Sequence, residues 1–149
     1  MSKARLLLHA AALVVPLLII LSRGPANMLA VAPVVGIVRI IGINGVIAVC
    51  AAQLACLIYW PWIERRARRN ASGWPIGIVL AGACHVLFSI GRLLPRMTRM
   101  HAFGEALGMS VLVLGFSLIF EGWLSFPLTM AVAQWVVHLR ARELHHVAA

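Results

Sequence analysis

The sequence predicts an all-α integral membrane protein with four transmembrane helices and one further apolar segment that is re-entrant or interfacial. Of the 149 residues, 62% are hydrophobic and only 11% are charged, whereas soluble domains carry about 25% charged residues. The apolar residues form long runs, as membrane helices require, instead of the alternation found in barrel strands. The basic residues lie at the ends of these runs, and no hydrophilic stretch is long enough for a separate soluble domain. We therefore expect residues 1–149 to form a single helical membrane domain.

The orientation follows from a cluster of four arginines that separates two long apolar runs. Aromatic residues stand just before and just after this cluster, and amphipathic rings favour the lipid–water boundary. Positive charge is retained on the cytoplasmic side, so we place the cluster in the cytoplasm and expect it to contact anionic lipid head groups. The formal charge of +9 is then explained by topology and lipid contact, and we expect no nucleic-acid partner. The arginines of this cluster are Arg65, Arg66, Arg68 and Arg69.

The first two apolar segments are residues 6–22 and 26–41. The first follows a basic start, and the residues from Ser22 to Pro25 make a poor cleavage site, so we interpret it as an uncleaved first span with a cytoplasmic N-terminus. The second contains Pro33, Gly36 and Arg39. If it crossed the membrane, the arginine cluster would lie outside, against the positive-inside rule, so we expect a non-crossing segment on the periplasmic side. A five-span protein with its N-terminus outside is the alternative.

The remaining spans are expected at about residues 45–63, 74–94 and 106–137. In the third span Gly77 and Ala81 are followed by His85 and Ser89 at four-residue spacing, and Arg92 extends the stripe. Such a stripe is typical of a helix-packing face. Both chain ends are then cytoplasmic, and we take the membrane to be a bacterial inner membrane crossed several times.

The last apolar stretch is too long for one straight crossing, and Pro127 within it predicts a kink. Three glycines at seven-residue spacing predict a second close-packing face, opposite a polar face that carries Ser117 and Glu121. A helix with these two faces is expected to lie between two neighbours. The three glycines are Gly108, Gly115 and Gly122.

Polar residues inside the spans are the candidate functional residues, because a charge at mid-bilayer costs about 2.5–3.5 kcal/mol on insertion scales. One hypothesis is that His85, Ser89, Ser117 and Glu121 form a cluster for proton movement or ligand binding. We favour the other, in which these groups bind one another or a partner subunit. No catalytic or metal-binding motif is present, and we expect no cofactor; haem at His85 is disfavoured because His9 and His138 lie at other depths. The intramembrane polar residues are His85, Ser89, Arg92, Ser117 and Glu121.

The C-terminal third carries a family resemblance. Arg99, Met100 and His101, then Gly104 with an apolar hairpin, and finally residues 140–144 resemble the C-terminal half of isoprenylcysteine and phospholipid methyltransferases. Those proteins bind S-adenosylmethionine through an Arg-His-Pro-x-Tyr motif and a later Glu-Glu pair. The proline, the tyrosine and the second glutamate are missing here. The resemblance implies, as an alternative, a membrane enzyme acting on a lipid or prenyl substrate.

Minimal loops, small-residue faces and the lack of a catalytic signature favour a non-enzymatic role. We expect an accessory or scaffolding subunit of a larger inner-membrane complex, which contacts anionic lipids and either other membrane subunits or further copies of itself. Besides the methyltransferase-like enzyme, the alternative is a small oligomeric transporter that uses Glu121 and His85.

Overall fold

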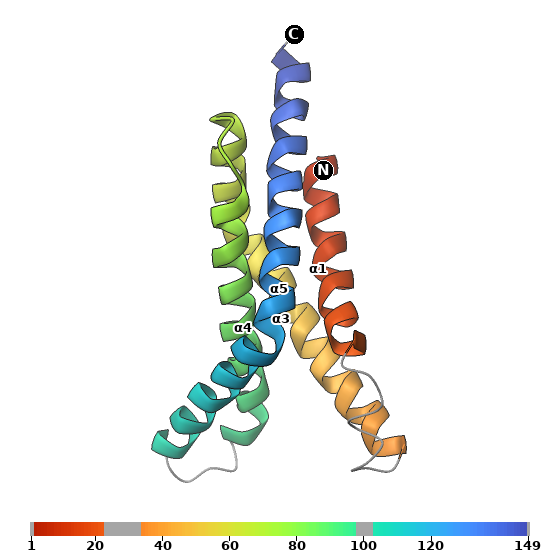
Figure 1. Ribbon diagram of the computed structural model, residues 1–149, viewed down its shortest axis with the longest axis vertical. Helices are drawn as coiled ribbons and strands as arrows, with labels where there is room; N and C mark the ends of the chain where they lie inside the picture. The colour runs from red at the N-terminus through yellow and green to blue at the C-terminus, as the bar shows by residue number, and fades with distance from the viewer. Residues whose placement is uncertain (1, 23–33, 98–102, 149) are drawn as a thin grey trace.

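The computed structural model describes residues 2–22, 34–97 and 103–148, and within these ranges it contains four helices and no strand. The helices are α1 (Lys3–Ser22), α3 (Val34–Arg68), α4 (Trp74–Met97) and α5 (Phe103–Ala148) (Figure 1). The all-helical prediction is therefore confirmed for the described part of the chain. Long apolar runs favour this outcome because a helix satisfies all of its backbone hydrogen bonds within one segment.

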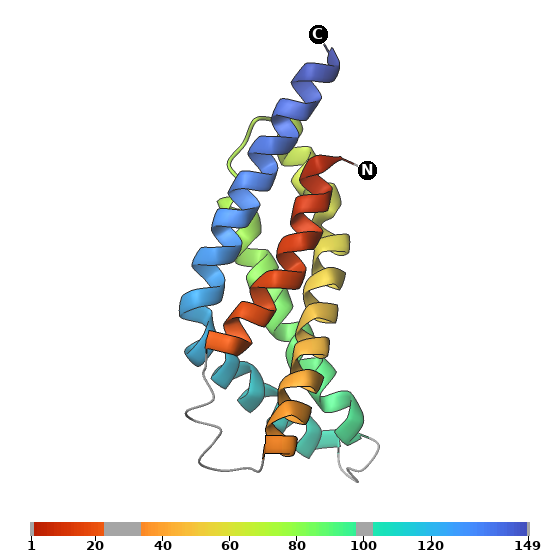
Figure 2. The same cartoon turned by 90° about the vertical axis from the view of Figure 1, so that its right-hand side faces the viewer.

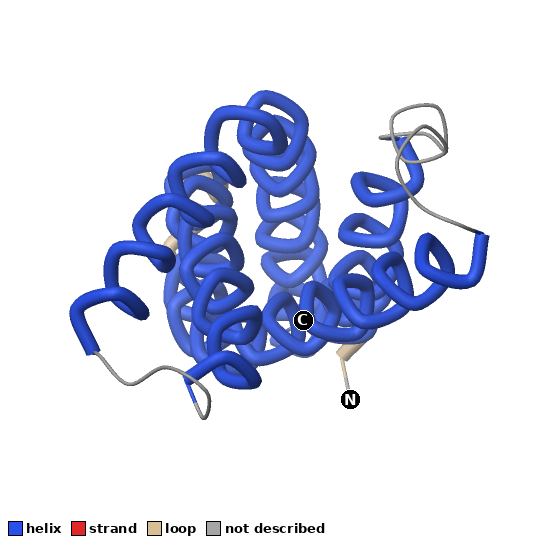
Figure 3. The backbone as a smooth tube through the Cα atoms, turned by 90° about the horizontal axis from the view of Figure 1, so that it is seen from below, coloured by secondary structure: helices blue, strands red, loops and turns tan. Residues whose placement is uncertain are grey.

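The helices alternate in direction and form an upright bundle. The start of α1, the connection between α3 and α4 and the end of α5 all lie at one end of the molecule, which is the upper end in both side views (Figures 1 and 2). Both α3 and α5 contact each of the other helices, whereas α1 and α4 lie on opposite sides of the bundle. Seen from below, the lower parts of α3 and α5 spread to opposite sides (Figure 3).

Two described segments are long and apolar enough to cross a membrane, namely Gly42–Arg68 and Trp74–Arg92. A third is obtained if the two arms of α5, Leu107–Ile119 and Glu121–His146, are counted as one broken span. The chain thus has two or three membrane-span candidates among its described residues. The full set of four spans stays a prediction.

No helix break marks the boundary expected between the non-crossing segment and the second span. Residues 23–33 lie outside the described residues, but Val34–Arg68 is one continuous helix that runs through residues 42–44 without a break. Gly42 and Gly45 each cost a helix about 1 kcal/mol relative to alanine, which is far less than the roughly 3 kcal/mol of a proline. The first proline inside α3 is Pro61, near its other end.

Helix α5 is bent by 67° between Ile119 and Glu121. The sequence predicted a kink from Pro127, and the helix does kink, but about two turns before the proline. Pro127 has no N–H to donate to the carbonyl of Trp123, and its ring crowds that carbonyl, so the turn that it weakens is 123–127, on the C-terminal side of the bend. Gly122 stands beside the bend.

The tightest helix contact joins α4 to α5. A Cβ built on Gly77 would lie 2.4 Å from the Cα of Met130, and one built on Gly73 would lie 2.6 Å from the carbonyl oxygen of Ala133. Ala81, on the same face of α4, is 2% exposed. The backbones of α4 and α5 can approach this closely only because these positions carry glycine or alanine.

Candidate functional site

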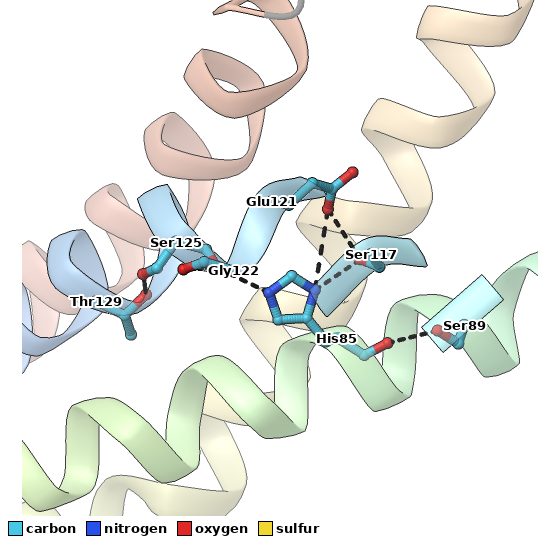
Figure 4. Close-up of polar contacts among 7 residues, drawn as sticks. All are labelled: His85, Ser89, Ser117, Glu121, Gly122, Ser125 and Thr129. Carbon is cyan, nitrogen blue, oxygen red and sulfur yellow. Dashed lines mark hydrogen bonds and ion pairs between the residues drawn. The ribbon is translucent and has the colours of Figure 1, made fainter. Parts of the chain in front are cut away.

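The candidate site is built around His85 in the middle of α4. The side chain is buried, and its imidazole ring lies beside the bend of α5 (Figure 4). Its Nδ1 is 2.7 Å from the Oγ of Ser117, and its Nε2 is 2.7 Å from the Oγ of Ser125. The ring also stacks on Phe126, with centroids 6.0 Å apart and planes 14° from parallel.

The bend of α5 allows His85 to contact both Ser117 and Ser125. Residues eight positions apart are about 12 Å apart along the axis of a straight helix. That is more than one imidazole ring covers with a hydrogen bond on either side. Ser117 and Ser125 stand on the two arms of α5, so the 67° bend draws their hydroxyl groups toward one ring. His85 therefore connects α4 to both arms of α5.

Hydrogen bonds connect His85 to both arms of α5. The Ser117 hydroxyl donates to the Oε2 of Glu121 at 3.0 Å, so its oxygen is left to accept from His85 Nδ1–H. The Ser125 hydroxyl, 2.7 Å from His85 Nε2, donates to the carbonyl oxygen of Gly122 at 3.5 Å. The contacts run from Ser125 through His85 and Ser117 to Glu121. Glu121 Oε2 is also 3.9 Å from His85 Nδ1.

The other predicted polar residues have more local roles. Ser89 is buried and donates to the carbonyl oxygen of His85 at 2.8 Å, which joins it to the network only through the backbone. Arg92 is half-buried near the lower end of α4, and its guanidinium lies 5.9 Å from the ring centre of Phe88. The structure thus brings His85, Ser117 and Glu121 together and leaves Arg92 apart from them.

A cavity of about 100 Å³ adjoins the network at the place where the four helices meet. All four contribute to its wall, which is mostly alanine and larger apolar side chains. His85, Glu121, Ser125 and Thr129 supply the polar part of the lining. Within the described residues no three His, Cys, Asp or Glu side chains are arranged to hold a metal ion.

The glycines expected to form packing faces divide into two groups. Gly77 and Ala81 lie in the contact between α4 and α5. By contrast, a Cβ on Gly108 or Gly115 would meet none of the described atoms within 4 Å, apart from the local helix backbone. Gly122 is buried, and a Cβ there would be 3.6 Å from the ring of Phe126 on its own helix.

The arginine cluster lies at the upper end of α3. Arg66 donates to the carbonyl oxygen of Ser72 at 2.8 Å, and its guanidinium is 5.7 Å from the ring centre of Trp62. Arg65 donates to the carbonyl oxygen of Pro61, and Arg68 lies 3.8 Å from Glu64. A groove on this surface is lined by two aromatic side chains and three of the arginines, together with apolar residues. Its aromatic and basic members are Tyr59, Trp62, Arg65, Arg66 and Arg69.

Three sets of polar contacts were missed by the sequence analysis. Ser125 and Thr129 continue the four-residue spacing of Ser117 and Glu121 across the bend, and this spacing is the signal that would have identified them. Thr129 donates to the carbonyl oxygen of Ser125 at 2.6 Å. Gln134 caps the start of α4, because its Oε1 accepts from the Gly73 N–H at 2.7 Å and from the Ser72 hydroxyl.

A third missed set of contacts ties three helices together at the upper end. Arg140 of α5 donates to Glu64 of α3 at 2.6 Å and to Glu143 at 3.2 Å. Glu143 in turn accepts from the backbone N–H of Ala4 in the first turn of α1, where a carboxylate also complements the helix dipole. No local spacing relates residues of three different helices, so the sequence carries no signal for this contact.

Comparison with models of known protein families, with curated protein sequences and with solved structures finds no match. Of the residues that carry the resemblance to methyltransferases, Arg99 to His101 lie outside the described residues, whereas Gly104 and residues 140–144 belong to α5.

Proposed function

We propose that the protein is an accessory or scaffolding subunit of a larger inner-membrane complex, and that it packs on its partners through small-residue helix faces. One observation carries this proposal. Gly73 and Gly77 are used inside the bundle, whereas Gly108 and Gly115 present an open face on the lower arm of α5. A glycine in a helix interior costs about 1 kcal/mol, so an open glycine stripe is best explained by a contact made with another chain.

The open face has the character of a helix–helix interface in a membrane. Gly104 and Gly108 are four residues apart and Gly115 is seven further on, which places all three on one side of the helix. Val111 lies on the same side and is 63% exposed. Without a hydrophobic driving force between helices in lipid, association depends on such close van der Waals packing. The partner is accordingly another transmembrane helix, which for an accessory subunit belongs to a different protein.

The proposal includes contact with anionic lipid at the end that carries both chain termini. Its support is the groove at the upper end of α3, where Arg65 and Arg69 are exposed beside the rings of Tyr59 and Trp62. Arginine and interfacial aromatic residues together suit the phosphate and boundary region of a lipid monolayer. We infer that this end is cytoplasmic.

A second candidate function is a small oligomeric transporter working through Glu121 and His85. It is favoured by the continuous hydrogen-bonded chain between these residues beside a cavity. The methyltransferase-like enzyme is the third alternative, and it rests on the sequence resemblance alone.

Purification in a mild detergent discriminates among these functions. A stoichiometric partner protein is the result expected for an accessory subunit. A homo-oligomer without other proteins would favour the transporter, and a co-purified nucleotide cofactor would favour the enzyme. A protein recovered as a monomer, with crosslinking in the membrane before extraction giving no product, would contradict the proposed role.

A further inference from the structure

The groove at the upper end of α3 orders its side chains by polarity along the helix. Its volume is about 610 Å³, and its lining begins with Ile58, continues with the rings of Tyr59 and Trp62, and ends with three arginines. A helix rises about 16 Å from position 58 to position 69. A phospholipid shows the same order, because an apolar chain leads through the boundary region, where aromatic rings are favoured, to a charged head group.

The arginines of the groove have no carboxylate partner among the described residues. In this part of the chain the arginines that form ion pairs are Arg68 and Arg140. Both use Glu64, which does not line the groove. The groove therefore carries three positive charges that no described carboxylate balances. These belong to Arg65, Arg66 and Arg69.

Two of the three guanidinium groups are held in place by the protein. Arg66 donates to the carbonyl oxygen of Ser72 at 2.8 Å and lies 5.7 Å from the ring centre of Trp62. Arg65 donates through Nε to the carbonyl oxygen of Pro61, so its two terminal nitrogens stay available. A guanidinium that is already positioned loses less freedom on binding, and it can bind a phosphate through two parallel N–H groups.

The turn after α3 completes the groove on the side of the helix end. Asn70 has a φ of 49°, a left-handed conformation that asparagine tolerates. This turn lets the N–H of Asn70 donate to the carbonyl oxygen of Ala67 and the N–H of Ala71 to that of Arg66. Carbonyl oxygens at a helix C-terminus disfavour an anion, and two of them are occupied here.

We propose that this groove is a one-to-one binding site for a phospholipid whose head group carries two phosphates. The phosphates lie at the three arginines, and an acyl chain follows the aromatic rings toward Ile58. One phosphodiester balances a single positive charge, whereas two phosphates on one head group can contact all three guanidinium groups. This inference rests on the proposed contact of this end with anionic lipid and specifies the class of lipid.

Native mass spectrometry of the protein released from detergent micelles tests the proposal, because it counts bound lipid molecules one by one. The probes are diphosphatidylglycerol, phosphatidylglycerol at twice the concentration, which equalises the phosphate, and zwitterionic phosphatidylcholine. Joining two phosphates makes the second contact intramolecular, so we expect the first diphosphatidylglycerol to bind at least about tenfold more tightly than the first phosphatidylglycerol. Phosphatidylcholine should bind more weakly than either.

Two variants show whether the groove carries this preference. Arg69 is exposed and forms no hydrogen bond within the described residues, so Arg69→Gln should fold normally and reduce the preference for diphosphatidylglycerol at least about threefold. Arg142→Gln is the control, because it removes the same charge from an exposed site at the same end of the bundle, outside the groove. It should leave the preference unchanged.

The possible failures have different consequences. Equal affinity for the two anionic lipids, with phosphatidylcholine weaker, would overturn the two-phosphate site and leave the proposed lipid contact standing. Equal binding of all three lipids would overturn both. Equal effects of Arg69→Gln and Arg142→Gln would show a diffuse attraction to the net charge of the protein and would also overturn the site.

Discussion

Substituting Gly77 by alanine is expected to destabilise the bundle although it adds a single methyl group. The new Cβ would lie 2.4 Å from the Cα of Met130, 2.8 Å from its backbone nitrogen and 3.0 Å from the carbonyl oxygen of Thr129. Carbon atoms pack best at about 3.5–4.0 Å, so α4 would have to move away from α5 by about 1 Å. All of the obstructing atoms belong to the backbone, and no side-chain rotation relieves the contact.

The expected magnitude follows from two opposing terms. Overpacking a close contact costs about 1–3 kcal/mol, and alanine recovers up to about 1 kcal/mol over glycine in helix propensity. The displacement would also disturb the neighbouring contact at Gly73, which is nearly as close. We therefore expect Gly77→Ala to lower the free energy of unfolding by about 2 kcal/mol.

Gly115→Ala is the matched control, because the added methyl meets no described atom beyond the local helix backbone. It should leave the free energy of unfolding unchanged or raise it by up to about 1 kcal/mol. The measurement is unfolding of the monomeric protein in mixed micelles, titrated with a denaturing detergent and followed by circular dichroism. If the two variants prove equally stable, α4 and α5 do not cross at Gly77 and the packing described above is wrong.

Two further predictions concern the contacts of Arg140 and the orientation of the bundle in the membrane. Arg140→Ala should lower the free energy of unfolding by about 1–3 kcal/mol, because it leaves Glu64 and Glu143 without their shared guanidinium. Arg142→Ala, at an exposed site, is the control and should leave the free energy of unfolding unchanged. Equal effects of the two substitutions in the same unfolding titration would refute the bridging role of Arg140. The orientation is tested by single cysteines in a chain whose native cysteines are replaced by alanine. Arg69→Cys should react with a membrane-impermeant thiol reagent from the cytoplasmic side only, and Gly104→Cys from the periplasmic side only. Reaction of both cysteines from the same side would exclude the proposed orientation of α3 and α5.

Regular spacing was sufficient to predict much of the α4 surface. Residues four apart share a helix face, so Gly77, Ala81 and His85 could be grouped from the sequence, and that face contacts α5 in the structure. Periodicity cannot distinguish a face that packs within the chain from one that packs on another molecule. Gly108 and Gly115 repeat just as regularly, yet a Cβ added at either would meet no described atom within 4 Å beyond the local helix backbone.

Features that depend on several helices at once were harder to predict. The continuity of α3 did not follow from positive-inside reasoning, which concerns which segments cross the membrane and not where a helix is interrupted. The sequence analysis anticipated a bend in α5 from Pro127. The bend itself lies just before Glu121, and this position brings Ser125 within reach of His85. No local sequence pattern fixes where the bend occurs. The bridge from Arg140 to Glu64 joins residues 76 positions apart and depends on the register of two helices.

The most direct test of the proposed role is the native mass of the protein and of Gly115→Leu, both extracted in the same mild detergent. A leucine side chain on the open face would hold a partner helix away, yet it meets nothing within the described bundle. We predict that the wild-type protein runs as a complex larger than the monomer and that Gly115→Leu inserts and folds normally but loses the complex. An unchanged complex in Gly115→Leu would show that this face of α5 meets only lipid, and would contradict the account of assembly through its glycines.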